Sequence, residues 1–340
     1  MALVLSSDYI TPNDLTGYVR DALADLPQNT FGLSAYLPDE ETDDIDWRAS
    51  VGGGGLSRAA SFRSFDAESP ISGRTGISRI GGELPPISEK RRLGEYDRLK
   101  MRKLDEGIKN AILNDAVDLA KAIKARLEIA RGEALQLGKV TLAENGLALE
   151  ADFGRKASHT QTAVIRWDQA GSDPINDLLA WSAVYKATNG IRPAEALVSD
   201  KLISTLMRNS AIRGYVLPAG SSQNIVTVDA LNALLASFQL PKFTVYEAQI
   251  QDNNGTAKDI LDPKRVLFLP PADQKIGATL WGLTAEAQDE NYGIDSNDAP
   301  GIVVGSYSDN DPVAQWTKAS AIALPVIPNA NLTLSGLALT

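Results

Sequence analysis

The amino-acid sequence predicts an α+β fold, and three observations support this prediction. Apolar residues recur at steps of three and four from about residue 96 to 137, which indicates one very long amphipathic helix. The pair Asn145-Gly146 stands between two stretches that alternate in polarity, which predicts a β-hairpin directly after that helix. Helical and strand-like segments then follow one another up to residue 269, so helices and strands are expected together in one mixed region.

Composition indicates a globular protein with one large domain or two ordinary ones. The chain has 340 residues, of which 44% are hydrophobic and 22% charged, and it has no cysteine. The lack of cysteine excludes disulfides, zinc–cysteine sites and thiol nucleophiles. No apolar run reaches the length of a membrane span, and the first residues do not resemble a secretory signal. We therefore expect a protein that is made and used in a cytoplasm.

The charge is unevenly placed along the chain. The formal net charge of −10 argues against a protein that binds nucleic acid by neutralising phosphates. Residues 1–50 hold two basic and ten acidic side chains, whereas residues 51–132 hold sixteen basic and eleven acidic ones. An acidic segment followed by a basic one indicates pairing, either within the chain or between subunits. The alternative is an ordinary solvated surface, on which each exposed pair contributes little.

The first 90 residues predict an arm followed by a long excursion. Residues 1–50 show no sustained period, and only a short helix near Thr11–Leu23 is expected, with Pro12 at its first position. The four glycines at 52–55 lack the Lys-Ser/Thr pair of a phosphate loop. In residues 51–90, apolar residues then alternate with arginines, which is typical of a long β-hairpin with too few apolar residues to form a core of its own. We therefore expect this hairpin to pack on another subunit. The predicted subunit contacts are Arg58, Arg63, Phe65, Arg74, Arg79, Asp43, Asp44 and Asp46.

The long helix is expected over about Tyr96–Leu137, and Gly138 is expected to end it. At 1.5 Å per residue it would be roughly 60 Å long. The steps do not keep a clean heptad, and Gly107 and Gly132 oppose a coiled coil. Its apolar face comprises Leu99, Leu104, Ile108, Ile112, Ala116, Leu119, Ile123, Leu127 and Ala130.

The second half of the chain predicts a hairpin at Lys139–Phe153 and then a mixed region. The last residues, 321–339, are expected to form one or two strands whose prolines suit a sheet edge or a switch between sheets. The helices expected in the mixed region are Asp177–Ala187, Ser199–Asn209 and Asp229–Phe238, and the strands are Ile225–Val228, Phe243–Tyr246 and Val266–Leu269.

A search for catalytic motifs finds none. Asp152-Phe153-Gly154 matches the magnesium-binding tripeptide of protein kinases, but no His-Arg-Asp loop precedes it. His159 is the only histidine and has no nucleophile at a motif position, so a structural role is expected. Acidic clusters such as Asp309-Asn310-Asp311 lack calcium-loop spacing. We predict no enzymatic activity, no cofactor and no metal.

The order of these parts resembles the lambda-like phage major capsid proteins (the major capsid protein E family), which have the Hong Kong 97 fold. The resemblance covers essentially the whole chain, and it rests on the order and spacing of short motifs rather than on one specific motif. These are Leu84-Pro85-Pro86-Ile87, Arg91-Arg92-Leu93-Gly94-Glu95, Arg126-Leu127-Glu128, Glu133-Ala134-Leu135, Gly138-Lys139-Val140, Asp152-Phe153-Gly154-Arg155 with His159, Trp167-Asp168, Trp316-Thr317-Lys318-Ala319 and Leu324-Pro325.

The resemblance implies a division of the chain into named parts. Residues 1–48 would be the N-terminal arm and 49–92 the extended loop. Residues 93–189 would form the peripheral domain with the spine helix and hairpin, and 190–305 the axial domain. Residues 306–340 would return to the peripheral domain as strands. No cleaved N-terminal scaffolding segment and no covalent cross-link are expected.

The resemblance also implies a function. The chain would be the major capsid protein of a tailed bacteriophage and self-assemble as hexamers and pentamers into an icosahedral shell around double-stranded DNA. It would be assembled in the host bacterial cytoplasm and reside in the virion. Its partners would be itself, a portal and scaffold or decoration proteins, with non-specific contact to DNA and no contact with a membrane. The alternatives are an encapsulin-type nanocompartment shell, a phage tail or adaptor protein, and a cytoplasmic enzyme.

Overall fold

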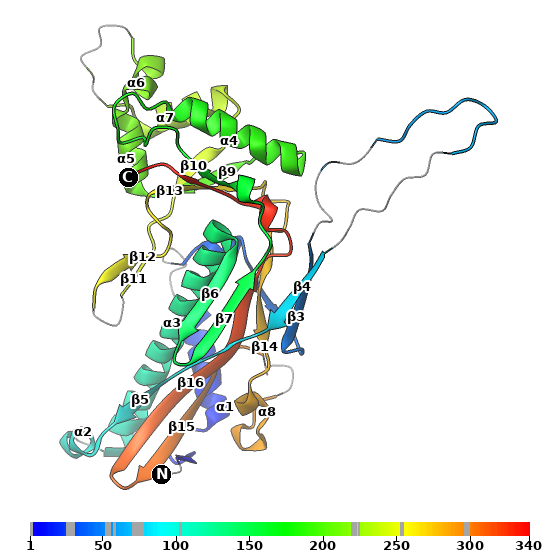
Figure 1. Cartoon of the computed structure of the whole chain (residues 1–340). Coiled ribbons are helices and arrows are strands. Elements are labelled where there is room, and N and C mark those ends of the chain that lie inside the picture. The colour runs from blue at the N-terminus through cyan, green and yellow to red at the C-terminus, as the bar shows by residue number, and fades with distance from the viewer. Residues whose placement is uncertain are drawn as a thin grey trace. The chain divides into compact units, whose positions relative to one another are not determined.

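The computed structural model describes residues 3–24, 31–51, 56, 59–69, 78–101, 104–218, 223, 225–251, 255–295 and 300–340. The chain divides into two compact units, each built from segments that are distant in the sequence. Unit 1 comprises residues 1–47, 82–131 and 278–326, and unit 2 comprises residues 48–81, 132–277 and 327–340. Both units combine helices with sheets (Figure 1), as the sequence predicts.

Unit 1 is built around a six-stranded sheet whose central strand is the long β16 (Val313–Val326). The sheet runs β1-β15-β16-β14-β2, and β5 also pairs with β16, antiparallel, from Gln315↔Leu93 to Ile322↔Pro86. Only the edge strand β2 lies parallel to its neighbour, β14. The remaining bounds are β1 Val4–Leu5, β2 Asp39–Glu41, β5 Pro86–Leu93, β14 Ala278–Gly282 and β15 Val303–Asn310.

Two helices supply the other half of the unit 1 core. The short predicted helix in the arm is present as α1 (Pro12–Ala24), with Pro12 at its first position and the Thr11 hydroxyl accepting a hydrogen bond from Asp14 N at 3.2 Å. The arm is more folded than expected, because α1 buries its apolar side chains against α3 (Leu104–Leu137) and the sheet. The core residues of these helices include Leu15, Val19, Leu23, Ile108, Ile112, Ala116, Leu119, Ile123 and Leu127.

The predicted long helix is confirmed from Leu104 onward, but the prediction that it begins at about Tyr96 is wrong. A separate helix, α2 (Glu95–Lys100), ends at Met101, whose backbone is extended with φ −74° and ψ 124°. Leu99, expected on the apolar face, is 79% exposed. The other end is as predicted: Gly138 has φ +72°, which favours glycine, and its N–H donates to Ala134 O.

Smaller elements cover part of the other face of this sheet. Helix α8 (Ala285–Gln288) and a 3₁₀ turn at Glu290–Tyr292 form a small cluster with Val303. Tyr292 and Tyr307 bond through their hydroxyls, and burial of Tyr292 raises its pKa above the ordinary value. The part of this face beside β5 lines a groove.

Unit 2 contains a five-stranded sheet in the order β10-β9-β13-β17-β8. Strand β9 runs parallel to β10, and β17 runs parallel to β8, whereas β13 is antiparallel to both of its neighbours. The bounds are β8 Thr160–Thr162, β9 Glu195–Val198, β10 Lys242–Val245, β13 Arg265–Leu269 and β17 Leu334–Leu337.

Four helices pack with this sheet around an aromatic core. Trp181 stacks on Trp167 with ring centroids 5.6 Å apart and meets Phe268 edge-on at 6.4 Å. The predicted strand Ile225–Val228 is wrong, because Thr227 caps a helix that begins at Val228 by accepting a hydrogen bond from Ala230 N. The helices are α4 Pro174–Asn189, α5 Asp200–Arg208, α6 Ser210–Val216 and α7 Val228–Ser237.

Three two-stranded ladders complete the structure. The predicted hairpin is confirmed as β6 (Lys139–Glu144) and β7 (Leu147–Asp152), with positive φ at both Asn145 and Gly146 as a tight hairpin turn requires. A second hairpin pairs β11 (Gln249–Gln251) with β12 (Ala257–Asp259). At the base of the Gly/Arg-rich excursion, β3 (Asp46–Val51) pairs with β4 (Ser78–Glu83). The C-terminal segment switches sheets as predicted, since β16 and β17 belong to different ones.

Candidate subunit-contact surfaces

The acidic residues predicted at a subunit contact gather on one exposed turn of unit 1. We call residues 41–46 the acidic corner: Glu41 ends the edge strand β2, Asp43 and Asp44 lie in the turn, and Asp46 begins β3. Ile45, in the middle of these carboxylates, is 55% exposed. The turn is held by its backbone, since Thr42 N donates to Trp281 O and Leu84 N donates to Ile45 O, both at 2.8 Å. The Thr42 hydroxyl also accepts a hydrogen bond from Asp44 N at 3.2 Å, whereas the side chains of Asp43, Asp44 and Asp46 are exposed and form no bond in the described chain.

A buried charge network fixes the strand that leads into this corner. Arg131 on α3 donates to Asp39 at 2.5 Å, to Glu128 at 3.1 Å and to Thr279 Oγ1 at 2.8 Å. Glu128, whose side chain is fully buried, also accepts a hydrogen bond from Leu33 N at 2.8 Å. Removing Arg131 would cost about 3–5 kcal/mol, because the fully buried Glu128 would be left without its cationic partner. The network therefore ties the arm to α3 and gives the acidic corner a firm base.

The excursion presents aromatic side chains that the described chain does not cover. Every described residue from 59 to 69 is exposed, and Phe62 and Phe65 are 107% and 99% exposed. Arg63 donates only to backbone carbonyls of its own segment, Ser64 O and Ala67 O. Arg79 lies exposed on β4. Arg58 and Arg74, the other predicted contacts, lie outside the described residues.

A second charged surface, which was not predicted from the sequence, lies on β5. Lys90 and Arg92 are exposed on this strand, with their cationic groups 4.8 and 5.9 Å from the centre of the Trp316 ring on β16. Arg91, between them, instead pairs with Asp115 and Asp118 on α3. Successive side chains of a strand point to opposite faces of the sheet. A strand predicted at residues 86–93 would therefore have placed Lys90 and Arg92 on one face and Arg91 on the other.

The tripeptide Asp152-Phe153-Gly154 is a structural turn. Asp152 Oδ1 accepts a hydrogen bond from Gly154 N at 2.8 Å, and Phe153 is fully buried. Arg155 follows and donates to Leu135 O and Gln136 O at the end of α3, at 3.3 and 2.8 Å. Burial lowers the pKa of Arg155 to about 10, so it stays charged at neutral pH. These bonds fasten the end of the hairpin to the end of the helix.

His159 is a buried histidine with one satisfied nitrogen. Its Nδ1 lies 3.0 Å from Thr333 O, and because a carbonyl only accepts, Nδ1 carries the proton. Its Nε2 is buried without a hydrogen-bond partner in the described chain. Burial lowers the pKa of His159 below 6.5, and the charges of Arg155 and Lys156 lower it further. The expected structural role agrees with this geometry.

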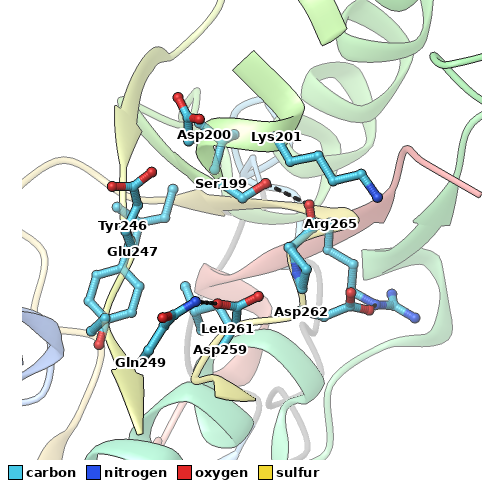
Figure 2. Close-up of a pocket in the computed structure, with 14 residues that line it drawn as sticks. Ser199, Asp200, Lys201, Tyr246, Glu247, Gln249, Asp259, Leu261, Asp262 and Arg265 are labelled. Carbon is cyan, nitrogen blue, oxygen red and sulfur yellow. Dashed lines mark hydrogen bonds and ion pairs between the residues drawn. The ribbon is translucent and has the colours of Figure 1, made fainter. Parts of the chain in front are cut away.

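A crevice at the carboxyl ends of the parallel strands β9 and β10 has a volume of about 380 Å³ (Figure 2). Several of its polar groups bond within the fold. Ser199 donates to Pro263 O at 2.7 Å and caps α5, Gln249 donates to Asp259 at 2.7 Å, and Arg265 pairs with Asp262 at 3.1 Å. No histidine lines it. The Ser199 hydroxyl is therefore bonded to a backbone carbonyl and not to a base.

The described residues contain no group of three or more His, Cys, Asp or Glu side chains that could hold a metal ion. In the same part of the chain, no helix combines the length and the apolar character that crossing a bilayer requires.

Comparison with solved structures defines the fold. A protein assigned as the capsid protein of an E. coli CFT073 prophage has a TM-score of 0.63, with 14% identity over 97% of this chain and 99% of that chain. A phage-related protein from Bordetella bronchiseptica RB50 has a TM-score of 0.53, with 13% identity over 99% and 98%. The capsid of a native GTA particle has a TM-score of 0.50, with 11% identity over 93% and 92%. The fold is that of Hong Kong 97-type phage capsid proteins, which confirms the predicted fold class.

The family follows from the sequence. The family model of phage major capsid protein E matches residues 15–338, so the chain belongs to this family and is a tailed-phage major capsid protein. A comparison with curated proteins finds no match. The family places the protein in the phage virion, where the capsid is assembled from copies of this chain. It also implies a structural role.

Proposed function

We propose that copies of this chain form the hexameric and pentameric capsomers of an icosahedral shell around double-stranded DNA, assembled in the host bacterial cytoplasm. Residues 1–48 act as the N-terminal arm, 49–92 as the extended loop, 93–189 as the peripheral domain, 190–305 as the axial domain, and 306–340 as strands that return to the peripheral domain. A portal and scaffold or decoration proteins complete the particle, and the shell contacts DNA non-specifically. Family membership favours this function over an encapsulin-type compartment.

The observation that best supports the proposal is the exposure of Phe62 and Phe65, at 107% and 99%. Burying one such side chain contributes about 1.5–3 kcal/mol, so two of them exposed to water favour association with a partner surface. Each subunit of a shell makes this contact once and receives it once. Modest contacts of this kind become strong when they are repeated around a closed assembly.

The proposal is tested by the double substitution Phe62→Ser/Phe65→Ser. Because neither side chain packs on the described chain, we expect subunits with an unchanged unfolding midpoint that need at least about tenfold more protein to form shells, which corresponds to about 1.4 kcal/mol. Ser61→Ala/Ser64→Ala, in the same exposed segment, is the matched control and should assemble normally. Assembly of the phenylalanine variant at the wild-type concentration would contradict the role of the excursion.

A further inference from the structure

Strand β5 sends its cationic side chains to two faces of the sheet, and only one face satisfies them with carboxylates. On the helix side, Arg91 donates to Asp115 at 2.9 Å and to Asp118 at 3.1 Å, and these hydrogen bonds raise its pKa further. On the other side, Lys90 and Arg92 lie over the Trp316 ring and pair with no carboxylate in the described chain. A cation on an indole face keeps its charge available to a second partner.

This second face forms a groove of about 410 Å³, lined by residues from β5, β15 and β16 and by Leu3. Lys318 also lines it but is neutralised by Glu286 at 2.5 Å. Glu89 is the single carboxylate in the lining, and it forms no ion pair in the described chain. Lys90 and Trp316 line the groove, and Arg92 lies over the same Trp316 ring beside it, so this face is cationic and aromatic, which suits an acidic segment that carries an apolar residue.

The acidic corner has this composition. Hydrogen bonds and ion pairs of the described chain leave the carboxylates of Glu41, Asp43, Asp44 and Asp46 unpaired, whereas Asp39 just before them is held by Arg131. Ile45, exposed among these carboxylates, is the apolar residue that such a groove could take. The corner and the groove belong to the same unit, yet the described chain contains no bond between them. The carboxylates of the acidic corner and the cations beside Trp316 are therefore not paired with each other inside the described chain.

We propose that the acidic corner of one copy binds the groove lined by Lys90 and Trp316, together with the adjacent Arg92, on a neighbouring copy. The contact deepens the proposed function and rests on it. It joins two different surfaces, so each subunit gives one corner and receives another, which is the arrangement from which rings are closed. Exposed ion pairs contribute little individually, but complementary patches fix register and suppress wrong pairings. The contact should weaken with salt.

A charge exchange tests this contact. Lys90→Glu/Arg92→Glu makes the groove acidic, and Asp43→Lys/Asp44→Lys makes the corner basic. We expect each pair of substitutions to raise the lowest protein concentration that gives shells at least tenfold. The four substitutions together should restore assembly to within about twofold of the wild type, because the combined chain keeps the wild-type net charge and recovers complementarity. Far-ultraviolet circular dichroism and the unfolding midpoint establish that each variant is folded.

Three results would overturn the inference. The first is normal assembly of either pair of substitutions. The second is a folded fourfold variant that assembles no better than the pairs. The third is that Lys90→Glu/Arg92→Glu forms normal shells that have lost only their contact with packaged DNA, which would assign the groove to phosphate. If the wild-type chain itself forms no shells, the proposed function fails. If the wild type assembles but the charge exchange gives any of these three results, only the contact between the acidic corner and the groove is contradicted.

Discussion

At the residue scale, His159 is the group whose charge the fold constrains most clearly. It is buried, its Nε2 has no acceptor in the described chain, and the cationic side chains of Arg155 and Lys156 act on it. Tyr185, whose ring lies 6.0 Å away, is kept neutral because burial raises its pKa. Protonation of His159 would thus place an unpaired charge in the core of unit 2.

This predicts a loss of stability on mild acidification. The pKa of His159 in the folded chain lies below 6.5, the ordinary value. Above pH 6.5 the imidazole is therefore mostly neutral in the folded and the unfolded chain, and as the pH falls below 6.5 the unfolded chain binds the proton first. The free energy of unfolding should fall by up to about 1.4 kcal/mol per pH unit below pH 6.5. His159→Asn, whose amide can still donate to Thr333 O, should flatten this slope. Urea midpoints measured between pH 5.5 and 7 decide it, and an equal slope in both proteins would contradict the account.

Individual residues also show how far sequence reasoning reached. The sequence placed Asp43, Asp44 and Asp46 among the contact residues, and they do lie together, because they are close in the chain. It missed Lys90, Arg92 and Trp316, because β5 and β16 meet only through tertiary pairing between residues more than 200 positions apart. It read Asp152-Phe153-Gly154 as the end of a hairpin strand, and the hydrogen bond within that turn agrees.

At the element scale, two glycines test what ends the long helix and what turns the hairpin. Gly138 and Gly146 have positive φ of 72° and 86°, so an alanine at either position costs about 1 kcal/mol of backbone strain. An added Cβ at Gly138 would also lie 2.8 Å from Arg155 Cβ, whereas one at Gly146 would meet nothing within 4 Å.

Gly138→Ala should therefore be clearly more destabilising than Gly146→Ala. We expect about 1 kcal/mol for Gly146→Ala and at least about 2 kcal/mol for Gly138→Ala, since the side chain of Arg155 must shift or lose its bonds to the helix end. Chemical denaturation of both variants measures the difference. Equal losses would mean that Arg155 moves freely and does not fasten the hairpin to the helix.

Elements with a strong local signal could be predicted, and those decided by packing or capping could not. The helix from Leu104 and the Asn145-Gly146 hairpin follow from periodicity and turn chemistry. The helix does not include Tyr96 and Leu99, which continue the apolar spacing but are 67% and 79% exposed. The β-branched run at residues 225–228 favours a strand by propensity, but the Thr227 cap begins a helix there.

At the scale of the whole molecule, the α+β class and the order of the parts were predictable because the family pattern extends along nearly the whole chain. The two units were harder to predict, since each is built from three separate segments of the sequence. A chain folded in this way places β1 and β2 of its arm, β5, and the late strands β14, β15 and β16 in one sheet. The candidate subunit-contact surfaces are thus built from residues that lie far apart in the sequence and share no local motif.

Electron microscopy of the purified, expressed chain, with sedimentation velocity on the same sample, tests the central claim most directly. The account predicts closed icosahedral shells built from hexameric and pentameric capsomers, in equilibrium with smaller species only at low protein concentration. A folded chain that remains monomeric at every concentration, in a buffer of low and of moderate salt, would contradict it.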